Sequence, residues 1–549
     1  MGARVFRAGG NAIDAGVAAG MALTVIEPHM CTFAGVAPIM VRATQAAEPI
    51  VIDGVGSWPA GILPERLAQW FGDDIPIGVQ RSVAPGAPGA WLTALRDYGT
   101  LPLRDVLEPV IELCLTGVPV SPGLAGFCGF FMDRMRLWPT TMEIFAPGGI
   151  PLTTGQLLRQ PSLASTFVTL LDAEAAARAE GMSREASIDA ARAEFYEGRI
   201  AHDMLALLRN FDWPMTAADL AGHRTRGERP VRTHYRGHEI YACGPWSQGP
   251  LLPMLLNLLE GYDLSPGTMT EEQYLHVFLE AFKLAGADRE AYFGDPHLVD
   301  VPIADLLSKE YAALRRSLIT ETAAPALPPP GNPVRDARAA RGAAGPPPLS
   351  PGNRPPDTSH VCAMDAQGNM LSALPSDHVF GSPMVPGRGF VISHRGGQFW
   401  LDPRHPGRLA PGKRPRITPN PAMVMRGDRP VLAFGSPGED LQCQAMAQFV
   451  NALLDRRLGL QAAVESRRVA SHALPSSFFP HAHAAPRAAL EIRDEDDVLA
   501  ALRARGHDVA ALPAYSYGTG AIGAVRLTEQ GHIEAAADPR RPEASAWAR

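Results

Sequence analysis

The sequence predicts an α+β protein in which helices pack on sheets as stacked layers. Helix-like and strand-like segments follow one another in mixed order along the 549 residues, an order typical of layered architectures. Hydrophobic residues make up 46% of the chain and charged residues 19%, which is enough apolar material for a sizeable core. The length allows several domains or one large layered unit, and no internal repeat is visible.

Helices dominate the first half of the predicted order. The first one begins near Asn11, whose side chain suits an N-cap, and ends at Pro28. In a later one, Leu275, Phe278 and Leu279 recur with helical spacing, which predicts one buried face. The remaining segments, taken in chain order, are strands at 37–43 and 49–56, helices at 103–116 and 162–180, a strand pair at 232–244 with a turn near Gly237, and the helix at 271–293 that also carries Phe282.

A change of composition separates this half from a mainly β-structured remainder. Residues 323–357 are rich in proline, glycine and alanine and can bury almost nothing, so we expect a mobile linker. Residues 358–376 then read as a hairpin with its turn at "AQGN". Further predicted segments are strands at 389–394, 422–427, 430–440 and 521–539 and a helix near 441–456.

Charge and cysteine usage exclude several classes of protein. The formal net charge is -7, from 57 acidic and 50 basic residues, so no basic surface invites nucleic acid or an acidic membrane. No apolar stretch approaches the roughly 20 residues of a membrane span, and the amino terminus lacks the order of a secretion signal, so we expect a cytoplasmic protein. Six cysteines occur singly and are expected as buried or semi-buried thiols: Cys31, Cys114, Cys128, Cys243, Cys362 and Cys443.

A hydroxyl residue, Thr358, stands where the linker meets the predicted hairpin. A hydroxyl needs a base beside it to act as a nucleophile at neutral pH. If the chain is cut between Asp357 and Thr358, the new α-amine, with a reference pKa of about 7.7–8.0, is such a base. Branching at Cβ also restricts the direction of the threonine hydroxyl. On the local pattern alone, an ordinary strand that begins with a polar residue is the stronger interpretation.

Ten ordered motifs across almost the whole chain favour the cut instead. The chain resembles the γ-glutamyltransferase family of N-terminal-nucleophile hydrolases, and these motifs carry the resemblance: "GGNAIDAGVAAGMALTVIEPH", "SVAPGAPGAWLTALRDYGTLPL", "YEGRIA", "EGYDL", "FKLAGADREAYFGDPHLVDVP", "LLSKEYAALR", "DTSH", "LAPGKRPR", "FGSPGED" and "AADPRR". The resemblance implies a four-layer αββα sandwich, made as a precursor that cuts itself. It implies a large-subunit region at 1–322, a linker at 323–357 and a small-subunit region at 358–549 that completes the same unit.

The same resemblance supplies the candidate catalytic residues. It implies that Thr358 is the nucleophile and that cleavage falls between Asp357 and Thr358. Ser376 is the match to a second hydroxyl that positions the new amine. The motif "GSPGED" implies an oxyanion hole made by the backbone amides of Gly438 and Glu439, although glutamate lacks the conformational freedom of glycine at positive φ. A strand-to-helix turn is the alternative interpretation of that motif. No metal ion and no organic cofactor are implied.

Four positions where the family binds substrate differ from its pattern or keep it only in part. Val55 stands where an arginine clamps the substrate carboxylate, and Gln398 stands where an acidic residue holds the substrate amine. Ile417 and Thr418 match two hydroxyl residues, so one hydroxyl is lost. Valine cannot offer the charged, bidentate fork of arginine, and glutamine brings no charge to an ammonium group. The loop "MCTFAGVAP" also has fewer glycines than the family pattern.

Three functions remain open on the sequence. The first is a self-processing transferase or hydrolase of γ-glutamyl amides such as glutathione. The second is an acylase of the same fold that acts on a different acyl group, such as a side chain of β-lactam type. The third is an uncut, inactive scaffold. The implied partners are a small amide substrate, water or an amine acceptor, and the two subunits of one precursor.

Three short motifs have simpler explanations. "GTGAIG", at 518–523, fits a dinucleotide fingerprint, but a strand and not a helix is predicted after it, so we reject a nucleotide site. His481 and His483 lack partner ligands at metal-binding spacing and are expected in a surface loop. "RGD", at 426–428, is expected to be a hairpin turn.

Overall fold

The computed structural model divides the chain into two compact units, each described here by itself. The first unit comprises Met1–Glu228, Pro355–Gly397 and Ala410–Arg414, and the second comprises Arg229–Arg354, Gln398–Leu409 and Pro415–Arg549. The structure describes residues 1–44, 46–333, 357–483, 487–493 and 497–548. The central stretch of the predicted linker, 334–356, therefore lies outside the described residues.

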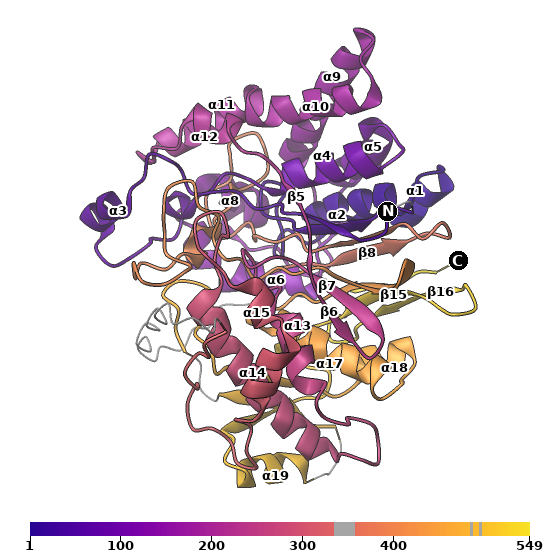
Figure 1. Ribbon diagram of the computed structural model, residues 1–549. Helices are drawn as coiled ribbons and strands as arrows, with labels where there is room; N and C mark the ends of the chain where they lie inside the picture. Colours follow the sequence, from indigo (N-terminus) through magenta and orange to yellow (C-terminus); the bar gives the residue numbers. More distant parts are fainter. Residues whose placement is uncertain (45, 334–356, 484–486, 494–496, 549) are drawn as a thin grey trace. The chain divides into compact units, whose positions relative to one another are not determined.

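A five-stranded antiparallel sheet carries the first unit, with helices packed against it (Figure 1). The strand order is β5-β2-β1-β9-β8, and Ile39 of β1 pairs with Ala373 of β9. Its strands are β1 (Ile39–Arg42), β2 (Ile50–Ile52), β5 (Gly227–Glu228), β8 (Val361–Met364) and β9 (Met370–Ala373), beside a small pair, β3 (Val118–Pro119) and β4 (Leu157–Leu158). Its helices are α1 (Gly2–Arg7), α2 (Ala12–Ile26), α3 (Pro64–Phe71), α4 (Ala87–Tyr98), α5 (Leu103–Thr116), α6 (Pro122–Phe130), α7 (Met132–Met135), α8 (Pro139–Phe145), α9 (Pro161–Ala179), α10 (Arg184–Tyr196), α11 (Arg199–Arg209) and α12 (Ala217–Ala221).

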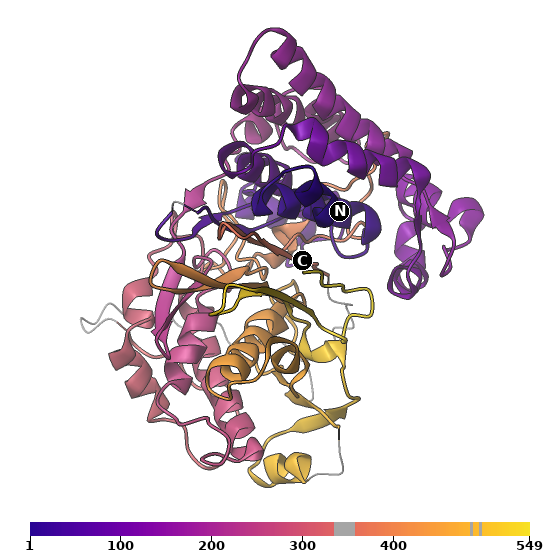
Figure 2. The ribbon, with the colours of Figure 1, turned by 90° about the vertical axis from the view of Figure 1, so that its right-hand side faces the viewer.

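A six-stranded antiparallel sheet carries the second unit, and α13 and α17 pack on it (Figure 2). The strand order is β16-β15-β11-β10-β7-β6. Its strands are β6 (Val231–Tyr235), β7 (His238–Ala242), β10 (Ala422–Arg426), β11 (Arg429–Gly435), β15 (Gly523–Leu527) and β16 (Ile533–Ala537), beside a three-stranded sheet of β12 (Val469–Ser471), β13 (Ala488–Glu491) and β14 (Val509–Leu512). Its helices are α13 (Leu251–Leu259), α14 (Glu271–Tyr292), α15 (Ile303–Leu306), α16 (Lys309–Arg316), α17 (Gln442–Leu454), α18 (Leu460–Glu465) and α19 (Val498–Ala504).

The first motif of the chain forms a buried helix that lies close against the sheet. Asn11 caps α2, since its side chain accepts hydrogen bonds from the backbone amides of Ile13 and Asp14. A Cβ on Gly16 would lie 2.6 Å from a methyl carbon of Leu371 in β9, so a larger residue there would force the Leu371 side chain to shift. The small residues of this motif thus bring α2 directly onto the strand pair that follows Thr358.

The predicted hairpin at 358–376 is confirmed, and its turn is fixed to the start of α2. Asp365 accepts hydrogen bonds from the backbone amides of Gln367 and Asn369, which closes the turn between β8 and β9. Its other carboxylate oxygen accepts a hydrogen bond of 2.9 Å from the backbone amide of Ala12. This hydrogen bond fixes the position of β8 along α2, and therefore also that of Thr358.

Most of the other predicted elements are also confirmed. In α14, Leu275, Phe278, Leu279 and Phe282 are all buried, as their spacing predicts. The strand pair with a turn at Gly237 exists as β6 and β7. The "RGD" motif joins β10 to β11, and "GTGAIG" leads into the strand β15. All six cysteines are free thiols, five buried and one, Cys362, half-buried.

Two predictions about local structure were wrong. Residues 389–394 form no strand, because their backbone groups bind loops instead: Ser393 donates to Ala34, and Val83 donates to Ser393. His481 does not lie in a surface loop. It is buried and stacks on Trp400 with 3.8 Å between the ring centroids.

The first part of the predicted linker is bound to α14. The backbone amide of Gly331 donates to Asp288 at 2.7 Å, and the Lys283 ammonium donates to the carbonyl of Ala324 at 2.8 Å. This segment is thus held through its main chain, and its Leu327 also packs against the core of the second unit.

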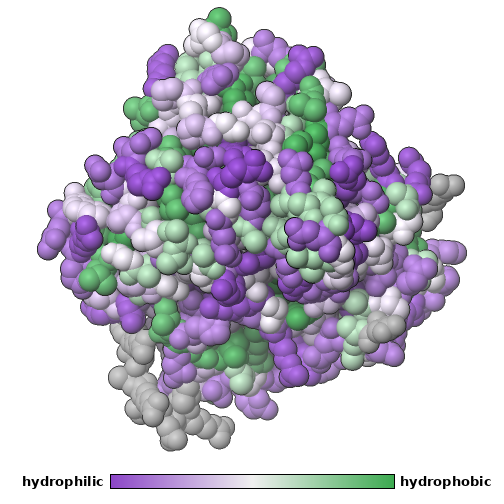
Figure 3. Space-filling model, turned by 90° about the horizontal axis from the view of Figure 1, so that it is seen from above, coloured by the Kyte–Doolittle hydropathy of each residue, from purple (hydrophilic) through white to green (hydrophobic). Residues whose placement is uncertain are grey.

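No described helix is long and apolar enough to cross a membrane. Figure 3 shows the face over α9 to α12, where hydrophilic residues prevail and hydrophobic ones are scattered.

Candidate active site

Thr358 lies fully buried, three residues before β8, in a backbone conformation that is rare for threonine. The structure describes Asp357 and Thr358 with the peptide bond between them intact. The φ angle of Thr358 is 137°, in the region that favours glycine, and its exposure is 0%. Positive φ at a β-branched residue is a strained conformation. Because φ describes rotation at the bond that follows the amide nitrogen, cleavage before Thr358 releases this constraint.

A second hydroxyl lies against that of Thr358. The Oγ atom of Ser376 is 2.8 Å from the Oγ1 atom of Thr358. The backbone sets this distance, since Ser376 pairs with Val36 and the Ser359 amide donates to the carbonyl of Pro375. Ser376, which the resemblance places beside the predicted nucleophile, is therefore in hydrogen-bond contact with Thr358.

A buried arginine, which the sequence analysis did not single out, supports Ser376. Arg395 has 0% exposure and donates through Nη2 to the Oγ of Ser376. The same nitrogen lies 3.2 Å from a carboxylate oxygen of Asp357, and Nε lies 2.8 Å from Asp377. Since arginine donates to Ser376, the serine hydroxyl proton is directed toward its other neighbours, Thr358 or Asp357.

Asp357, the residue before the predicted cut, has its side chain inside the same cluster. One carboxylate oxygen lies 3.5 Å from the Ser376 hydroxyl, and the other accepts from the backbone amide of His378 at 3.4 Å. Its exposure is 0%. The structure therefore brings together both residues of the predicted cleavage bond, Ser376, and two charged side chains around one hydroxyl pair.

Gly35, in the loop "MCTFAGVAP", is required by this geometry. A Cβ on Gly35 would lie 2.3 Å from the carbonyl oxygen of Ser376 and 2.9 Å from the Cβ of Asp377. Both contacts are shorter than real Cβ atoms allow. The loop keeps glycine at the position that contacts Ser376 and Asp377.

The histidine of the "DTSH" motif is a neutral structural group. Burial lowers the pKa of His360 to about 3, and its Nε2 lies 3.1 Å from the hydroxyl of Ser372. The hydrogen-bond partner that the structure gives the Thr358 hydroxyl is another hydroxyl, not an imidazole. This arrangement suits a base that is supplied by the α-amine of Thr358 itself.

In the second unit, the predicted oxyanion residues lie in a turn between β11 and α17. Gly438 has a φ of 120° and Glu439 a φ of 53°, so glutamate occupies a left-handed conformation where glycine is easier. The side-chain amide of Gln248 donates to the carbonyl of Glu439 at 2.8 Å and to that of Thr418 at 2.9 Å. One glutamine thus joins the turn to the strand-like segment that carries two of the predicted substrate residues.

The predicted substrate residues are buried and without charge. Ile417 and Val55 are apolar, with exposures of 0% and 1%, and Gln398 is 1% exposed. The Oγ1 of Thr418 is buried and has no hydrogen-bond partner among the described residues. A buried hydroxyl of this kind commonly bonds an ordered water or a ligand.

A network of ion pairs binds the side chain of Asp440, which follows Gly438 and Glu439 in the turn. Arg289 in α14 contacts Asp440 at 2.6 Å, and Asp440 also accepts from the amide and hydroxyl of Ser477. Next to it, Glu290 contacts Arg416 at 3.0 Å. Burial raises the pKa of Glu290, but Arg416 and Arg289 outweigh it and hold the pKa well below its usual range. This network explains the motif residues of α14, which the sequence analysis quoted without a role.

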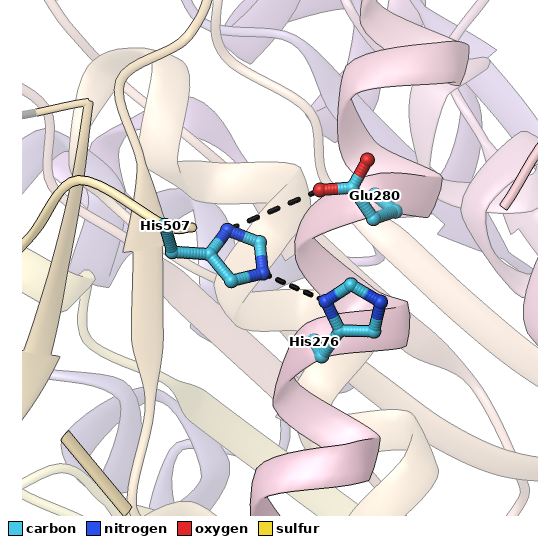
Figure 4. Close-up of side chains that lie close together, drawn as sticks. All are labelled: His276, Glu280 and His507. Carbon is cyan, nitrogen blue, oxygen red and sulfur yellow. Dashed lines mark hydrogen bonds and ion pairs between the residues drawn. The ribbon is translucent and has the colours of Figure 1, made fainter. Parts of the chain in front are cut away.

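Three ligand-type side chains meet elsewhere in the second unit: His276, Glu280 and His507 (Figure 4). His276 is 2.8 Å from His507 and bonds the carbonyl of Thr320 through its other nitrogen. The Lys283 ammonium lies 2.6 Å from the Glu280 oxygen that faces His507. A cation of the protein already occupies that carboxylate, so we interpret the cluster as a hydrogen-bonded anchor for the segment after α16 and assign no metal to it.

Comparisons with known proteins agree with this geometry. The family model described as Gamma-glutamyltranspeptidase matches residues 1–548. The glutathione hydrolase-like YwrD proenzyme of Bacillus subtilis is 29% identical over 98% of this chain and 94% of its own length. The acylase ACY 1 proenzyme of a Pseudomonas species is 32% identical over 95% and 87%. The crystal structure of cephalosporin acylase from Bacillus halodurans matches with a TM-score of 0.83 and 28% identity over 98% and 92%.

A hydroxyl pair before a β-hairpin, in a layered α+β fold, is the arrangement of an N-terminal-nucleophile hydrolase, and the predicted fold class is confirmed. The chain belongs to the gamma-glutamyltranspeptidase family and is an enzyme of the hydrolase and acylase type. The predicted relationship is thereby confirmed.

Proposed function

We propose that the chain is a self-processing amidohydrolase that uses Thr358 as its nucleophile. The observation that carries this proposal is the buried contact of 2.8 Å between the hydroxyls of Thr358 and Ser376, beside a strained peptide link. The proenzyme relatives support it, because a proenzyme is cut before it acts.

The proposed maturation is an attack of Thr358 on its own preceding peptide. The Oγ1 atom adds to the carbonyl carbon of Asp357, the carbon–nitrogen bond breaks, and the hydroxyl proton passes to the nitrogen, which becomes the new α-amine. Water then hydrolyses the resulting ester, which leaves a carboxylate on Asp357 and a free hydroxyl on Thr358. Strain at φ of Thr358 favours the step, since the product no longer carries it.

The proposed turnover repeats the same bonds with an external amide. The α-amine of Thr358 takes the hydroxyl proton, the hydroxyl attacks the substrate carbonyl, and the leaving amine receives the proton. An ester on Thr358 results, and water or an acceptor amine releases the acyl group. The roles of Gly438 and Glu439 as oxyanion donors remain predictions from the resemblance, as do the subunit boundaries at Asp357 and Thr358.

Two substrate classes are candidates. Hydrolysis or transfer of γ-glutamyl amides such as glutathione is the first, as in the glutathione hydrolase-like relative. An acylase activity on a different acyl amide is the second, as in the acylase relative. The uncharged side chains of Val55 and Gln398 favour the second, because a γ-glutamyl group brings both an ammonium and a carboxylate to be bound.

The test is cleavage of the purified protein and of its Thr358→Ala variant. Wild type is expected to give two bands of about 38 and about 20 kDa from the 58.7 kDa chain on denaturing electrophoresis, and the variant one full-length band. Thr358→Ser, which keeps the hydroxyl, is the matched control and is expected to be cut. A wild-type chain that stays whole on long incubation contradicts the proposal and favours the scaffold.

A further inference from the structure

His481 lies buried in a loop of the second unit, in a backbone conformation that is rare for histidine. Its exposure is 3% and its φ is 59°, in the left-handed region that favours glycine. Its imidazole stacks on the indole of Trp400, with 3.8 Å between the ring centroids and 2° between the ring planes. The backbone and the stack together fix the directions in which the two ring nitrogens point.

Each ring nitrogen of His481 faces a backbone carbonyl oxygen. Nδ1 lies 2.9 Å from the carbonyl oxygen of Ser476, and Nε2 lies 2.9 Å from that of Phe399. A carbonyl oxygen only accepts hydrogen bonds, and a neutral imidazole has one N–H donor and one lone pair. Both contacts are therefore hydrogen bonds only when both nitrogens carry a proton and the ring is an imidazolium.

His405, which stacks on the same indole at 4.0 Å, has partners of a different kind. Its Nδ1 accepts a hydrogen bond of 2.9 Å from the backbone amide of Gly407, and its Nε2 lies 3.4 Å from Glu290. One nitrogen accepts and the other donates, which suits a neutral ring. Burial lowers the pKa of His405 to about 4. The two histidines on Trp400 thus differ in the number of protons that their partners require.

The loop of His481 contacts two segments that carry predicted site residues. Ser477, in the same loop, donates through its amide and its hydroxyl to Asp440, which follows the predicted oxyanion residues. The imidazole of His481 binds the carbonyl of Phe399, which follows the predicted substrate residue Gln398. The histidine therefore joins the segment of Gln398 to the loop that holds the oxyanion turn.

Charged groups on the neighbouring elements act on the proton of His481 in opposite directions. Burial lowers the pKa of His481 and Arg416 lowers it further, whereas the two carbonyls and Glu290 of α14 raise it. His405 is neutral, and Asp440 is already paired with an arginine of α14. The net direction is downward, so the proton is lost as the pH rises through a range below the ordinary value of about 6.5.

We propose that His481 is a positioning residue of the substrate site, and that it holds the segment of Gln398 only while both of its ring nitrogens carry a proton. Loss of one proton leaves one hydrogen bond and turns a lone pair toward a carbonyl oxygen, which weakens the link between the segment and the loop. This inference rests on the proposed function, and it deepens it by adding a proton-dependent step to substrate binding. KM and kcat are both expected to rise with pH, but through His481 and the α-amine of Thr358, respectively.

The proton is measured first, by nitrogen NMR of the protein with isotope-labelled histidine. At about pH 4.5 we expect wild type to show an imidazolium that is absent from His481→Gln, and at about pH 8 the same ring is expected to be neutral. His483→Gln is the matched control from the same loop, and it is expected to keep the wild-type signal of His481. A His481 ring that is neutral at about pH 4.5 overturns the inference.

Hydrogen exchange measured by mass spectrometry then tests the link itself and needs no substrate. At about pH 4.5, peptides that cover 398–409 are expected to exchange at least about threefold faster in His481→Gln than in wild type. At about pH 8 the two are expected to differ less, because wild type has lost the same link. His483→Gln is expected to follow wild type at both values. A difference of equal size at both values, or no difference at either, overturns the inference.

Kinetics on the mature enzyme tests the consequence for the substrate. γ-Glutamyl and glutaryl p-nitroanilides are used in parallel, because only the first carries an ammonium group that titrates. For wild type we expect KM at about pH 5.5 to be up to about tenfold lower than at about pH 8, the factor of one hydrogen bond. In His481→Gln the KM is expected to be the same at both values, while kcat still rises with pH.

A pH dependence of KM that persists in His481→Gln contradicts the inference. A wild-type chain that is never cut contradicts the proposed function instead, and that failure is seen on the gel. The NMR and exchange measurements still decide the role of His481 in such a chain, so the two failures are distinguishable.

Discussion

The neighbourhood of Thr358 and the turn of Gly438 both contain buried ion pairs, but the charges stand in different places. Around Thr358, Arg395 donates to the Ser376 hydroxyl, which contacts the proposed nucleophile. At the turn, Arg289 binds the side chain of Asp440, behind the backbone that carries the predicted oxyanion donors. In the first region the charged group contacts the hydroxyl beside the proposed nucleophile, and in the second it fixes a main-chain conformation.

This difference indicates how each region should respond to substitutions. A hydroxyl that reacts must be held in one direction by its hydrogen-bond partner, so the loss of a single donor or acceptor near Thr358 is expected to slow the reaction. A turn that offers backbone amides needs only its conformation, and the glutamate at φ 53° shows that a costly conformation is kept when its surroundings are rigid. Substitutions in the first region are therefore expected to change rates, and those in the second to change stability first.

The largest expected effect is the loss of Asp440. Asp440→Ala leaves Arg289 buried without this partner and removes two bonds to Ser477, so we expect a loss of about 3 kcal/mol in unfolding free energy. Thermal unfolding of the purified protein measures it. Glu529→Ala is the control, since its pair with Arg426 is exposed, and it is expected to leave the midpoint unchanged. Equal midpoints for Asp440→Ala and wild type would refute the bracing role.

The next effect is on the rate of self-cleavage. Ser376→Ala removes the hydroxyl at 2.8 Å from Thr358, and we expect cleavage about 10- to 100-fold slower, the factor of a charge-assisted hydrogen-bond network. A time course of the full-length band measures it. Ser372→Ala removes an equally buried serine from β9 that contacts His360, and is expected to be cut at a near-normal rate. Equal slowing in both variants would assign the effect to packing.

A smaller effect is the acid sensitivity of the second unit. Burial, with the nearby Lys283 and His276, lowers the pKa of His507 to about 3. As the pH falls, His507 is therefore protonated in the unfolded chain before it is protonated in the folded protein. The stability that this histidine contributes is complete above its ordinary pKa of about 6.5 and is lost progressively as the pH falls toward 3. Unfolding midpoints at pH 7 and 5 are expected to differ less in His507→Gln. An unchanged difference would show that His507 is not the titrating group.

The smallest expected effect concerns the hydroxyl of Thr418. Thr418→Val replaces a buried hydroxyl that has no partner among the described residues, so stability should stay the same or rise. If the hydroxyl binds the acyl group, KM rises by up to about tenfold while kcat changes little. Steady-state kinetics with an anilide that the mature enzyme hydrolyses separates KM from kcat. An unchanged KM would remove Thr418 from the substrate site.

Features that depend on one segment of the chain could be predicted from the sequence, whereas contacts between segments that are distant in the sequence could not. The cap at Asn11 and the buried face of α14 follow from spacing within one segment, and both are present. Thr358 and Ser376 were found because a family motif points to them. Arg395 was missed, since nothing near it in the sequence shows that Asp357, 38 residues away, shares its site. Its buried position needs the hairpin and the 376–377 turn to be in place.

The same limit applies to the linker and to His481. Proline-rich composition predicts a lack of apolar burial but says nothing of the main-chain bonds that tie Gly331 to α14. His481 was expected in a surface loop because no partner ligand stands at metal-binding spacing from it in the sequence. It is buried because Trp400, distant in sequence, supplies a stacking partner.

Intact-mass spectrometry of the purified protein, with sequencing of any new amino terminus, tests the central claim most directly. The account predicts two chains, one that ends at Asp357 and one that begins with Thr358 and carries a free α-amine. A single mass for the whole 549-residue chain in an enzymatically active sample would contradict it.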